Sequence, residues 1–324
     1  PSASRATSAV ASRPSAAPAR SERAHVSRAR GIPQNRAMTT AFASVDDVCR
    51  VLADAGYLAS DAIATTTFLA DRLGKPLLVE GPAGVGKTEL AKAVARATGA
   101  RLIRLQCYEG VDEARALYEW NHAKQLLRIT AERDGDGHWD ALRHDIFTDE
   151  FLLARPLLEA VRSEDPVVLL VDELDKADVE IEGLLLEILS DFQVTVPELG
   201  TITAAHRPFV VLTSNATREL SEALRRRCLF LHIDYPSPGL EQRIVAQHVP
   251  GLEATLVESV VRLVGRLREL RLRKAPSVSE TVDWARTLVA LGSTDLTADV
   301  LRDNLGVLLK HQDDIERAAK ALDL

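Results

Sequence analysis

At Gly81-Pro82-Ala83-Gly84-Val85-Gly86-Lys87-Thr88 the sequence has the G-x-x-x-x-G-K-[ST] spacing of a phosphate-binding loop. The apolar residues 76–79 precede this segment and predict a buried strand. Residues 89–98, rich in Ala, Leu and Lys, follow it and predict a helix that ends at Gly99. A position between a strand and a helix distinguishes a phosphate loop from a glycine-rich turn with an incidental lysine. The segment therefore predicts an α/β fold built around a phosphate site.

The residue types in this loop suit a nucleoside triphosphate. The glycines allow a tight turn that directs backbone N–H groups at phosphate oxygens, and the start of the following helix adds positive potential. We expect Lys87 to neutralise the β- and γ-phosphates and Thr88 to hold Mg²⁺ through its hydroxyl. No residue of the sequence distinguishes ATP from GTP.

A second strong signal lies at residues 166–173, with the sequence Pro-Val-Val-Leu-Leu-Val-Asp-Glu. Its aliphatic run predicts a strand buried on both faces. The strand ends in Asp172 and Glu173, at the sheet edge where the phosphate loop also lies in an open α/β sheet. We expect Asp172 to reach the Mg²⁺ shell and Glu173 to orient the attacking water. The alternative is that the two carboxylates cap the next helix, but the strand provides the context expected of a catalytic pair.

Residues 192–204 alternate apolar and polar side chains on both sides of a Pro-Glu-Leu-Gly turn, which predicts a β-hairpin. Residues 209–213 form the next predicted strand, and it ends at Ser214-Asn215. An amide at this place can hydrogen-bond a γ-phosphate or a water, although asparagine after a strand is also an ordinary turn residue. The position of this strand, next after the acidic pair, favours the functional interpretation of Asn215.

Three adjacent arginines, Arg225, Arg226 and Arg227, stand directly before a predicted strand at residues 229–233. One interpretation is an arginine finger, with Arg227 or Arg226 donated to the γ-phosphate of a neighbouring subunit. The other interpretation is a solvated basic cluster.

The rest of the chain is mostly helical in its periodicity. Apolar residues at helical spacing predict helices over residues 45–55, 61–73, 112–129, 148–162, 179–190, 240–249, 253–272, 279–291 and 297–309. The helix over 112–129 includes Leu126 and Leu127 on its apolar positions. A break at Tyr235-Pro236-Ser237-Pro238 predicts a domain boundary near residue 236. We expect a nucleotide-binding α/β domain with N-terminal helices over 38–235 and a small all-helical lid over 236–324.

Composition separates a tail from an acidic body. Residues 1–37 are rich in Ala, Ser, Arg and Pro, contain seven arginines and one acidic residue, Glu22, and are expected to be disordered. We expect the only methionine, Met38, to be the natural start. The formal net charge of −7 makes a general nucleic-acid binder unexpected, because phosphate affinity is built from Lys and Arg. The three cysteines have no C-x-x-C spacing and are expected to be small buried residues in the reducing cytoplasm, and no apolar run is long enough to span a bilayer.

The order of these motifs resembles the AAA+ ATPases: a phosphate loop, an acidic strand end, a hairpin, an Asn strand end, an arginine cluster and a helical lid. The segments Glu109-Gly110-Val111-Asp112-Glu113-Ala114 and Tyr118-Glu119-Trp120-Asn121 look like the MoxR-type group, nearest to ATPases associated with carbon-monoxide dehydrogenase maturation. The resemblance covers residues 40–310 and implies a parallel αβα sheet core followed by a helical lid.

The resemblance also implies roles for single residues. Gly81 to Thr88 would be the Walker A loop, Asp172 and Glu173 the Walker B pair, and Asn215 sensor 1. Arg227, with Arg226 as its rival, would be the trans-acting finger. The family usually places a sensor 2 arginine at the start of a lid helix, where this chain has Ser279 or Glu280, with Arg286 as a weak substitute. ATP and Mg²⁺ are the implied cofactors, and a homo-hexamer, with a separate partner carrying a von Willebrand A domain, is the implied assembly.

Three functional classes follow from these observations. The first is an ATP-hydrolysing chaperone that remodels or activates a client protein, such as a metalloenzyme during its maturation. The second is a nucleic-acid motor or clamp-loader-like ATPase, which the hairpin disfavours because residues 191–205 hold Asp191 and Glu198 but no Lys or Arg. The third is a scaffold that binds ATP without appreciable hydrolysis, which the Asp172–Glu173 pair disfavours and the missing sensor 2 arginine favours.

Overall fold

The computed structural model describes residues 40–131 and 145–324. These residues belong to one compact unit, Met38–Leu324. The tail expected over residues 1–37, and the start expected at Met38, lie outside the described residues.

A parallel five-stranded sheet forms the centre of the fold, in the order β2-β5-β8-β1-β9. The strands are β1 (Leu77–Glu80), β2 (Arg101–Gln106), β5 (Val167–Asp172), β8 (Phe209–Ser214) and β9 (Leu229–His232). Every residue of β1 and β5 is buried, as expected for strands covered on both faces. The predicted parallel sheet is therefore confirmed.

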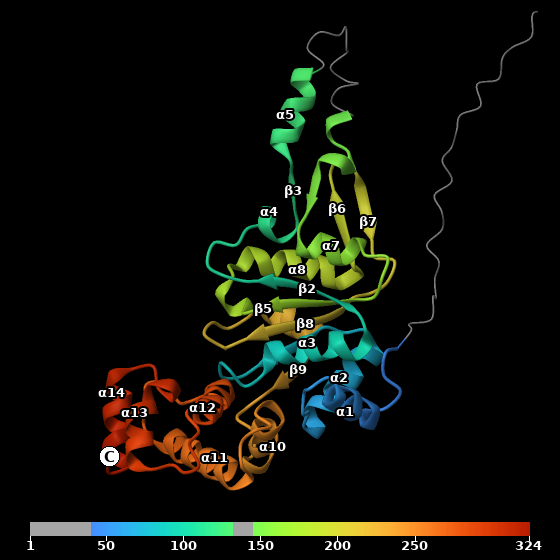
Figure 1. The fold of residues 1–324 in the computed structure, drawn as a ribbon. Helices are drawn as coiled ribbons and strands as arrows, with labels where there is room; N and C mark the ends of the chain where they lie inside the picture. The colour runs from blue at the N-terminus through green and yellow to red at the C-terminus, as the bar shows by residue number, and fades with distance from the viewer. Residues whose placement is uncertain (1–39, 132–144) are drawn as a thin grey trace, which may run out of the picture. The chain divides into compact units, whose positions relative to one another are not determined.

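Alternate residues of the strands feed two separate hydrophobic clusters, one on each face of the sheet. Leu77 and Val79 of β1 join the cluster made with helices α1 (Val45–Asp54), α2 (Asp61–Leu73) and α3 (Lys87–Thr98). Leu78, between them, joins the opposite cluster with helices α4 (Glu113–Ala116), α7 (Pro156–Arg162) and α8 (Val179–Asp191). Figure 1 shows the sheet between α3 on one side and α7 and α8 on the other. The core is the predicted three-layer αβα arrangement.

The hairpin predicted over residues 192–204 is present as β6 (Gln193–Val196) and β7 (Gly200–Thr203). The two strands pair antiparallel, with Gln193 opposite Thr203. Phe192, between α8 and β6, adopts a left-handed backbone and is buried in the core. The hairpin therefore continues directly from α8, which itself begins six residues after Glu173.

The helices predicted over residues 112–129 and 148–162 are wrong. The first stretch contains α4, then strand β3 (Tyr118–Trp120), then α5 (His122–Ala131). The second contains a 3₁₀ turn (Asp149–Phe151), strand β4 (Leu152–Ala154) and α7.

The physical reason is pairing between these two stretches, which helical periodicity does not reveal. β3 pairs antiparallel with β4, and its aromatic Tyr118 and Trp120 suit a strand. Pro156 can start α7 but cannot stand inside a helix that runs through it. Leu126 and Leu127, expected on an apolar face, are 64% and 72% exposed on α5.

The C-terminal part is all helical, as predicted. It consists of α10 (Pro238–His248), α11 (Ala254–Glu269), α12 (Val278–Ala290), α13 (Ala298–Leu308) and α14 (Gln312–Ala321), the last of which was not predicted. These helices form two hydrophobic clusters of their own, which share no residue with the clusters of the sheet. The boundary near residue 236 stays a prediction.

Two further expectations concern cysteines and membranes. Cys107 and Cys228 are buried free thiols, while Cys49 is partly exposed. Across the described ranges, no helix has both the length and the apolar character that a bilayer crossing demands.

Candidate nucleotide site

The phosphate loop connects β1 to α3 and depends on glycine at its first position. Gly81 has a φ of 151°, and a Cβ atom there would lie 1.9 Å from the carbonyl oxygen of Ile233. A side chain at Gly81 would therefore strike the backbone at the end of β9. Gly84 and Gly86 also have left-handed φ values, of 76° and 100°. The loop keeps its shape because its glycines allow both the turn and this close packing.

Lys87 begins α3 and bends its ammonium group back over the loop. Its Nζ donates to the carbonyl oxygens of Gly81 and Pro82, both at 2.7 Å, and to Oδ1 of Asn215 at 2.8 Å. Burial lowers the pKa of Lys87, while the charges of Asp175, Asp172 and Glu173 act in the opposite direction. The structure therefore brings Lys87 and Asn215 together, although 128 positions separate them in the chain.

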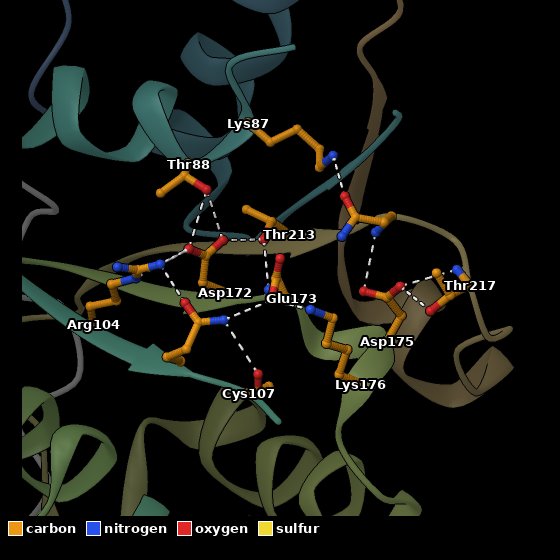
Figure 2. A network of polar contacts seen from close by, with 12 residues as sticks. Lys87, Thr88, Arg104, Cys107, Asp172, Glu173, Asp175, Lys176, Thr213 and Thr217 are labelled. Atoms are coloured by element: carbon orange, nitrogen blue, oxygen red, sulfur yellow. Dashed lines mark hydrogen bonds and ion pairs between the residues drawn. The ribbon is translucent and has the colours of Figure 1, made fainter. Parts of the chain in front are cut away.

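Asp172 ends β5 and accepts hydrogen bonds on both oxygens. Thr88 Oγ1 donates to Oδ1 and Oδ2, at 2.9 and 3.2 Å, and Thr213 Oγ1 donates to Oδ1 at 2.5 Å. Arg104 of β2 donates to Oδ2 from Nε at 3.1 Å and from Nη2 at 2.5 Å. Figure 2 shows Thr88, Arg104 and Thr213 directed at this carboxylate from three sides. The predicted pair Thr88 and Asp172 is adjacent, and the other two partners were not predicted.

Glu173 has a left-handed backbone, with φ 56°, which is uncommon for a residue other than glycine. Its N–H donates to Thr213 Oγ1 at 2.9 Å. Its carboxylate accepts from Gln106 Nε2 at 3.0 Å and from Lys176 Nζ at 2.7 Å. The side chain is thus held by two donors, and its backbone is fixed to the end of the neighbouring strand.

Asp175 is a buried member of the network that the sequence did not indicate. It accepts from the N–H of Asn215 at 3.1 Å, and from the N–H and Oγ1 of Thr217 at 3.0 and 2.5 Å. Burial raises the pKa of Asp175, but the hydrogen bonds from Thr217 and Asn215 outweigh it and leave this pKa below its ordinary value. Asp175 therefore positions Asn215, whose side chain accepts from Lys87.

The three arginines of α9 (Glu222–Arg227) have different partners. Arg226 is paired with Glu222 of its own helix at 2.9 Å, and Arg227 donates to Ser190 Oγ at 3.0 Å. Arg225, which was not predicted as functional, turns inward and donates to Glu80 at 2.7 Å. Glu80 is the residue directly before Gly81. Only Arg225 of the three is therefore tied, among the described residues, to the strand that carries the phosphate loop.

The lid touches the phosphate loop at the start of α12. The N–H of Ser279 donates to the carbonyl oxygen of Gly84 at 3.3 Å. A Cβ atom at Gly84 would lie 2.4 Å from Ser277 Oγ. Glu280 completes a capping box with Ser277, and Arg286 pairs with Asp283 of its own helix at 3.3 Å. Serines and a capping carboxylate thus occupy the place where an arginine was expected.

The residues fit an oxygen-liganded Mg²⁺. A threonine hydroxyl and a carboxylate lie together at the start of α3, and hard oxygen donors are the ligands that Mg²⁺ prefers. Mg²⁺ also keeps waters and takes phosphate oxygens, so one or two protein ligands suffice. A separate cluster of three or more His, Cys, Asp or Glu side chains that could hold a metal is absent from residues 40–131 and 145–324.

Comparison with known proteins identifies the domain that carries this network. Residues 77–235 match the family described as ATPase family associated with various cellular activities (AAA). Residues 77–235 are an AAA ATPase module. The matched residues of this AAA module begin at β1 and end after β9, so they include every strand of the central sheet.

Relatives with similar sequences include three curated proteins. The gas vesicle ATPase GvpN of Haloferax mediterranei is 25% identical over 78% of this chain and 75% of that protein. Protein NorQ of Paracoccus denitrificans is 26% identical over 60% of this chain and 66% of its own length. Protein CbbQ of Hydrogenophilus thermoluteolus is 25% identical over 67% of this chain and 73% of that protein.

Among solved structures, a RuvB mutant of Thermotoga maritima matches with 16% identity and a TM-score of 0.43, covering 87% of this chain and 71% of that one. The predicted assignment to AAA+ ATPases of the MoxR type is confirmed by the family match and the relatives. The nearer likeness to carbon-monoxide dehydrogenase maturation ATPases stays a prediction.

Proposed function

We propose that this AAA ATPase binds Mg·ATP at the phosphate loop and uses its hydrolysis to remodel or activate a client protein, namely a metalloenzyme during its maturation. The observation that carries the nucleotide part is a pair of contacts beside the phosphate loop: Lys87 donates to Asn215, and Thr88 donates to Asp172. The metalloenzyme client rests on the resemblance of the MoxR-type segments.

The residues of this site would divide the work as follows. Lys87 would exchange its carbonyl partners for the β- and γ-phosphates. Thr88 and Asp172 would hold Mg²⁺, which stabilises the charge that develops on the phosphates during transfer. Glu173 would polarise a water once Gln106 and Lys176 release its carboxylate, and Asn215 would position the same water or the γ-phosphate.

Completion of the site by a neighbouring copy is the part of the proposal that concerns assembly. The side chain of Arg226 is 77% exposed, and its one partner within residues 40–131 and 145–324 is Glu222, so its guanidinium is available to a second subunit. Arg227 is the rival, with Ser190 as its partner. A homo-hexameric ring and a separate von Willebrand A partner are the proposed assembly, and the cytoplasm is the proposed location.

Substitution of the two catalytic residues tests the nucleotide part. Lys87→Ala should abolish nucleotide binding, whereas Glu173→Gln should bind ATP but release phosphate about 100-fold or more slowly than the wild type. Steady-state phosphate release and binding of a fluorescent ATP analogue measure the two effects separately. Normal hydrolysis by Glu173→Gln would contradict the role given to this carboxylate.

The client part has its own experiment. The Glu173→Gln protein, which should retain ATP, is purified from its native source together with whatever is bound to it. A metalloenzyme subunit or its assembly factor should be enriched over the Lys87→Ala control. Equal recovery of all proteins with both variants would contradict an ATP-dependent client.

A nucleic-acid motor is the second candidate. The hairpin β6–β7 argues against it, since residues 191–205 contain two acidic and no basic side chains. A salt-dependent DNA affinity of about 1 μM or tighter, measured on residues 38–324, would reverse this preference. A third candidate, a scaffold that binds ATP without hydrolysing it, would be indicated by phosphate release no faster in the wild type than in Glu173→Gln.

A further inference from the structure

Arg104 forms an ion pair with Asp172, the carboxylate that the proposed Mg²⁺ site requires. Its Nε and Nη2 donate to Oδ2 of Asp172 at 3.1 and 2.5 Å, and Nη2 also donates to Gln106 Oε1. Figure 2 shows the Arg104 side chain approaching Asp172 across the end of the sheet. Arg104 comes from β2, whose register places it opposite Leu170 and two residues before Gln106, which is opposite Asp172.

The Asp172 carboxylate has no unoccupied oxygen in this arrangement. Thr88 and Thr213 donate to Oδ1, while Arg104 and Thr88 donate to Oδ2. The side chain of Asp172 is 2% exposed, so solvent does not replace any of these donors. A metal that binds Asp172 directly must therefore displace at least one of them, and Arg104 is the only one that carries a full charge.

The charges around the site decide when such a displacement is favourable. Three carboxylates (Asp172, Glu173 and Asp175) are matched by three cations (Lys87, Arg104 and Lys176), which contact them or donate to their neighbours. A lone Mg²⁺ would add two positive charges beside Arg104 and Lys87. Mg²⁺ that arrives with a triphosphate brings net negative charge, which both cations favour.

We propose that Arg104 is a latch on Asp172, which keeps this carboxylate closed to free Mg²⁺ and releases it only when Mg²⁺ arrives with the nucleotide. The inference rests on the proposed Mg²⁺ site at Thr88 and Asp172. Arg104 is suited to this exchange because its side chain is 47% exposed, so the released guanidinium enters water at little cost. It acts as a positioning residue, through Asp172, and makes metal binding depend on nucleotide binding.

Removing the latch should expose Asp172 to Mg²⁺ in the absence of nucleotide. The probe is MgCl₂ alone, titrated into nucleotide-free full-length protein by calorimetry and by the shift in thermal unfolding temperature. We expect Arg104→Gln to bind Mg²⁺ at least ~10-fold more tightly than the wild type, because a competing positive charge has gone. The gain should disappear in Arg104→Gln/Asp172→Asn, which locates the bound metal.

Arg101→Gln is the matched control. Arg101 lies on the same strand, is similarly exposed at 54%, and pairs with Glu159 away from the site. The Arg101→Gln substitution removes one positive charge from the protein, as Arg104→Gln does, but leaves the contacts of Asp172 intact. The Mg²⁺ affinity of Arg101→Gln should therefore equal that of the wild type. Arg104→Lys keeps the positive charge, so its affinity for Mg²⁺ alone should remain close to that of the wild type. This variant provides a second test if Arg104→Gln folds poorly.

Binding of Mg²⁺ with a non-hydrolysable ATP analogue separates the latch from the site. If all of these single Arg variants bind the Mg·analogue complex, but Arg104→Gln and the wild type have the same affinity for Mg²⁺ alone, the latch is wrong and the proposed site stands. If the wild type does not bind the Mg·analogue complex, the proposed site itself is wrong, and the inference fails with it.

Discussion

The buried ion pair between Arg268 of α11 and Glu241 of α10 should be the most sensitive point of the lid. Arg268 donates to both oxygens of Glu241, at 2.6 and 2.8 Å, and to the carbonyl oxygen of Pro276 at 2.9 Å. Thr281 Oγ1 donates to Glu241 as well, at 2.8 Å. The two charged side chains are only 13% and 2% exposed. Arg268→Met would leave the Glu241 carboxylate buried without its cation.

The magnitude follows from that burial. Removing one partner of a buried pair costs about 3–5 kcal/mol of unfolding free energy, and the remaining exposure of Arg268 favours the lower figure. For a domain of 60–100 residues, the size of the lid predicted over 236–324, about 3 kcal/mol corresponds to a fall of roughly 12 °C or more in the thermal midpoint. Arg262→Met is the control, because Arg262 is on the same helix but 65% exposed and 3.9 Å from Glu258. That variant should stay within about 0.5 kcal/mol of the wild type.

Thermal and urea unfolding of the two variants, followed by circular dichroism, check this expectation. The double variant Arg268→Met/Glu241→Leu should recover a large part of the loss, since no unpaired charge is then buried. If Arg268→Met proves as stable as Arg262→Met, the pair does not hold the lid together and the reasoning from burial is refuted.

Three further outcomes are expected. Gly81→Ala should abolish nucleotide binding, measured with a fluorescent ATP analogue, because a Cβ atom would lie 1.9 Å from the Ile233 oxygen. Glu173→Gln should lower phosphate release by about 100-fold or more while ATP binding persists; binding and turnover that fall together would count against this. Asp175→Asn should cost about 2 kcal/mol at neutral pH, where the carboxylate is ionised. Because the pKa of Asp175 is lowered on folding from 3.8, its stabilisation exists above that pH and is lost as the pH falls further, so urea unfolding at low pH should show the variant and the wild type converging.

The strand ends of the nucleotide site could be predicted because parallel topology places them. Lys87, Asp172 and Asn215 each follow or end a buried apolar run, and such runs meet at one edge of an open sheet. The distance of 2.8 Å between Lys87 Nζ and Asn215 Oδ1 is a consequence of that rule rather than of any local signal. Lys87 and Asn215 lie together because β8, which ends just before Asn215, is the neighbour of β1 in the sheet.

Arg104 and Gln106 could not be predicted in the same way. Both lie on β2, where alternating polar residues indicate only an exposed strand face. The signal available was their spacing of two, which directs both side chains to one face near the end of the strand. The sequence alone does not show that this face lies beside Asp172, because that follows from the pairing of β2 with β5.

The β3–β4 pair shows where a local sequence pattern predicts the wrong structure. Helical periodicity over residues 112–129 is a local pattern, while the strand at Tyr118–Trp120 exists because a segment more than thirty residues later pairs with it. Non-local pairing overrides local propensity whenever an aromatic or β-branched run finds a partner strand. α14 was missed for a different reason, since its apolar positions are few and mostly alanine in an otherwise polar segment.

The contact between lid and phosphate loop does not depend on a long cationic side chain. Ser277 caps α12 and sits against Gly84, while Glu280 closes the cap and pairs with Lys274 at 3.1 Å. The backbone N–H of Lys274 donates in turn to the buried Asp314 of α14, at 3.1 Å. The contact with the loop itself joins the backbone of Gly84 to Ser277 and Ser279, whose short side chains have little freedom to adjust. A change in the backbone at Gly84 must therefore displace the start of α12. The lid should move with the loop through these short contacts, whereas a long arginine side chain would have allowed the two to move independently.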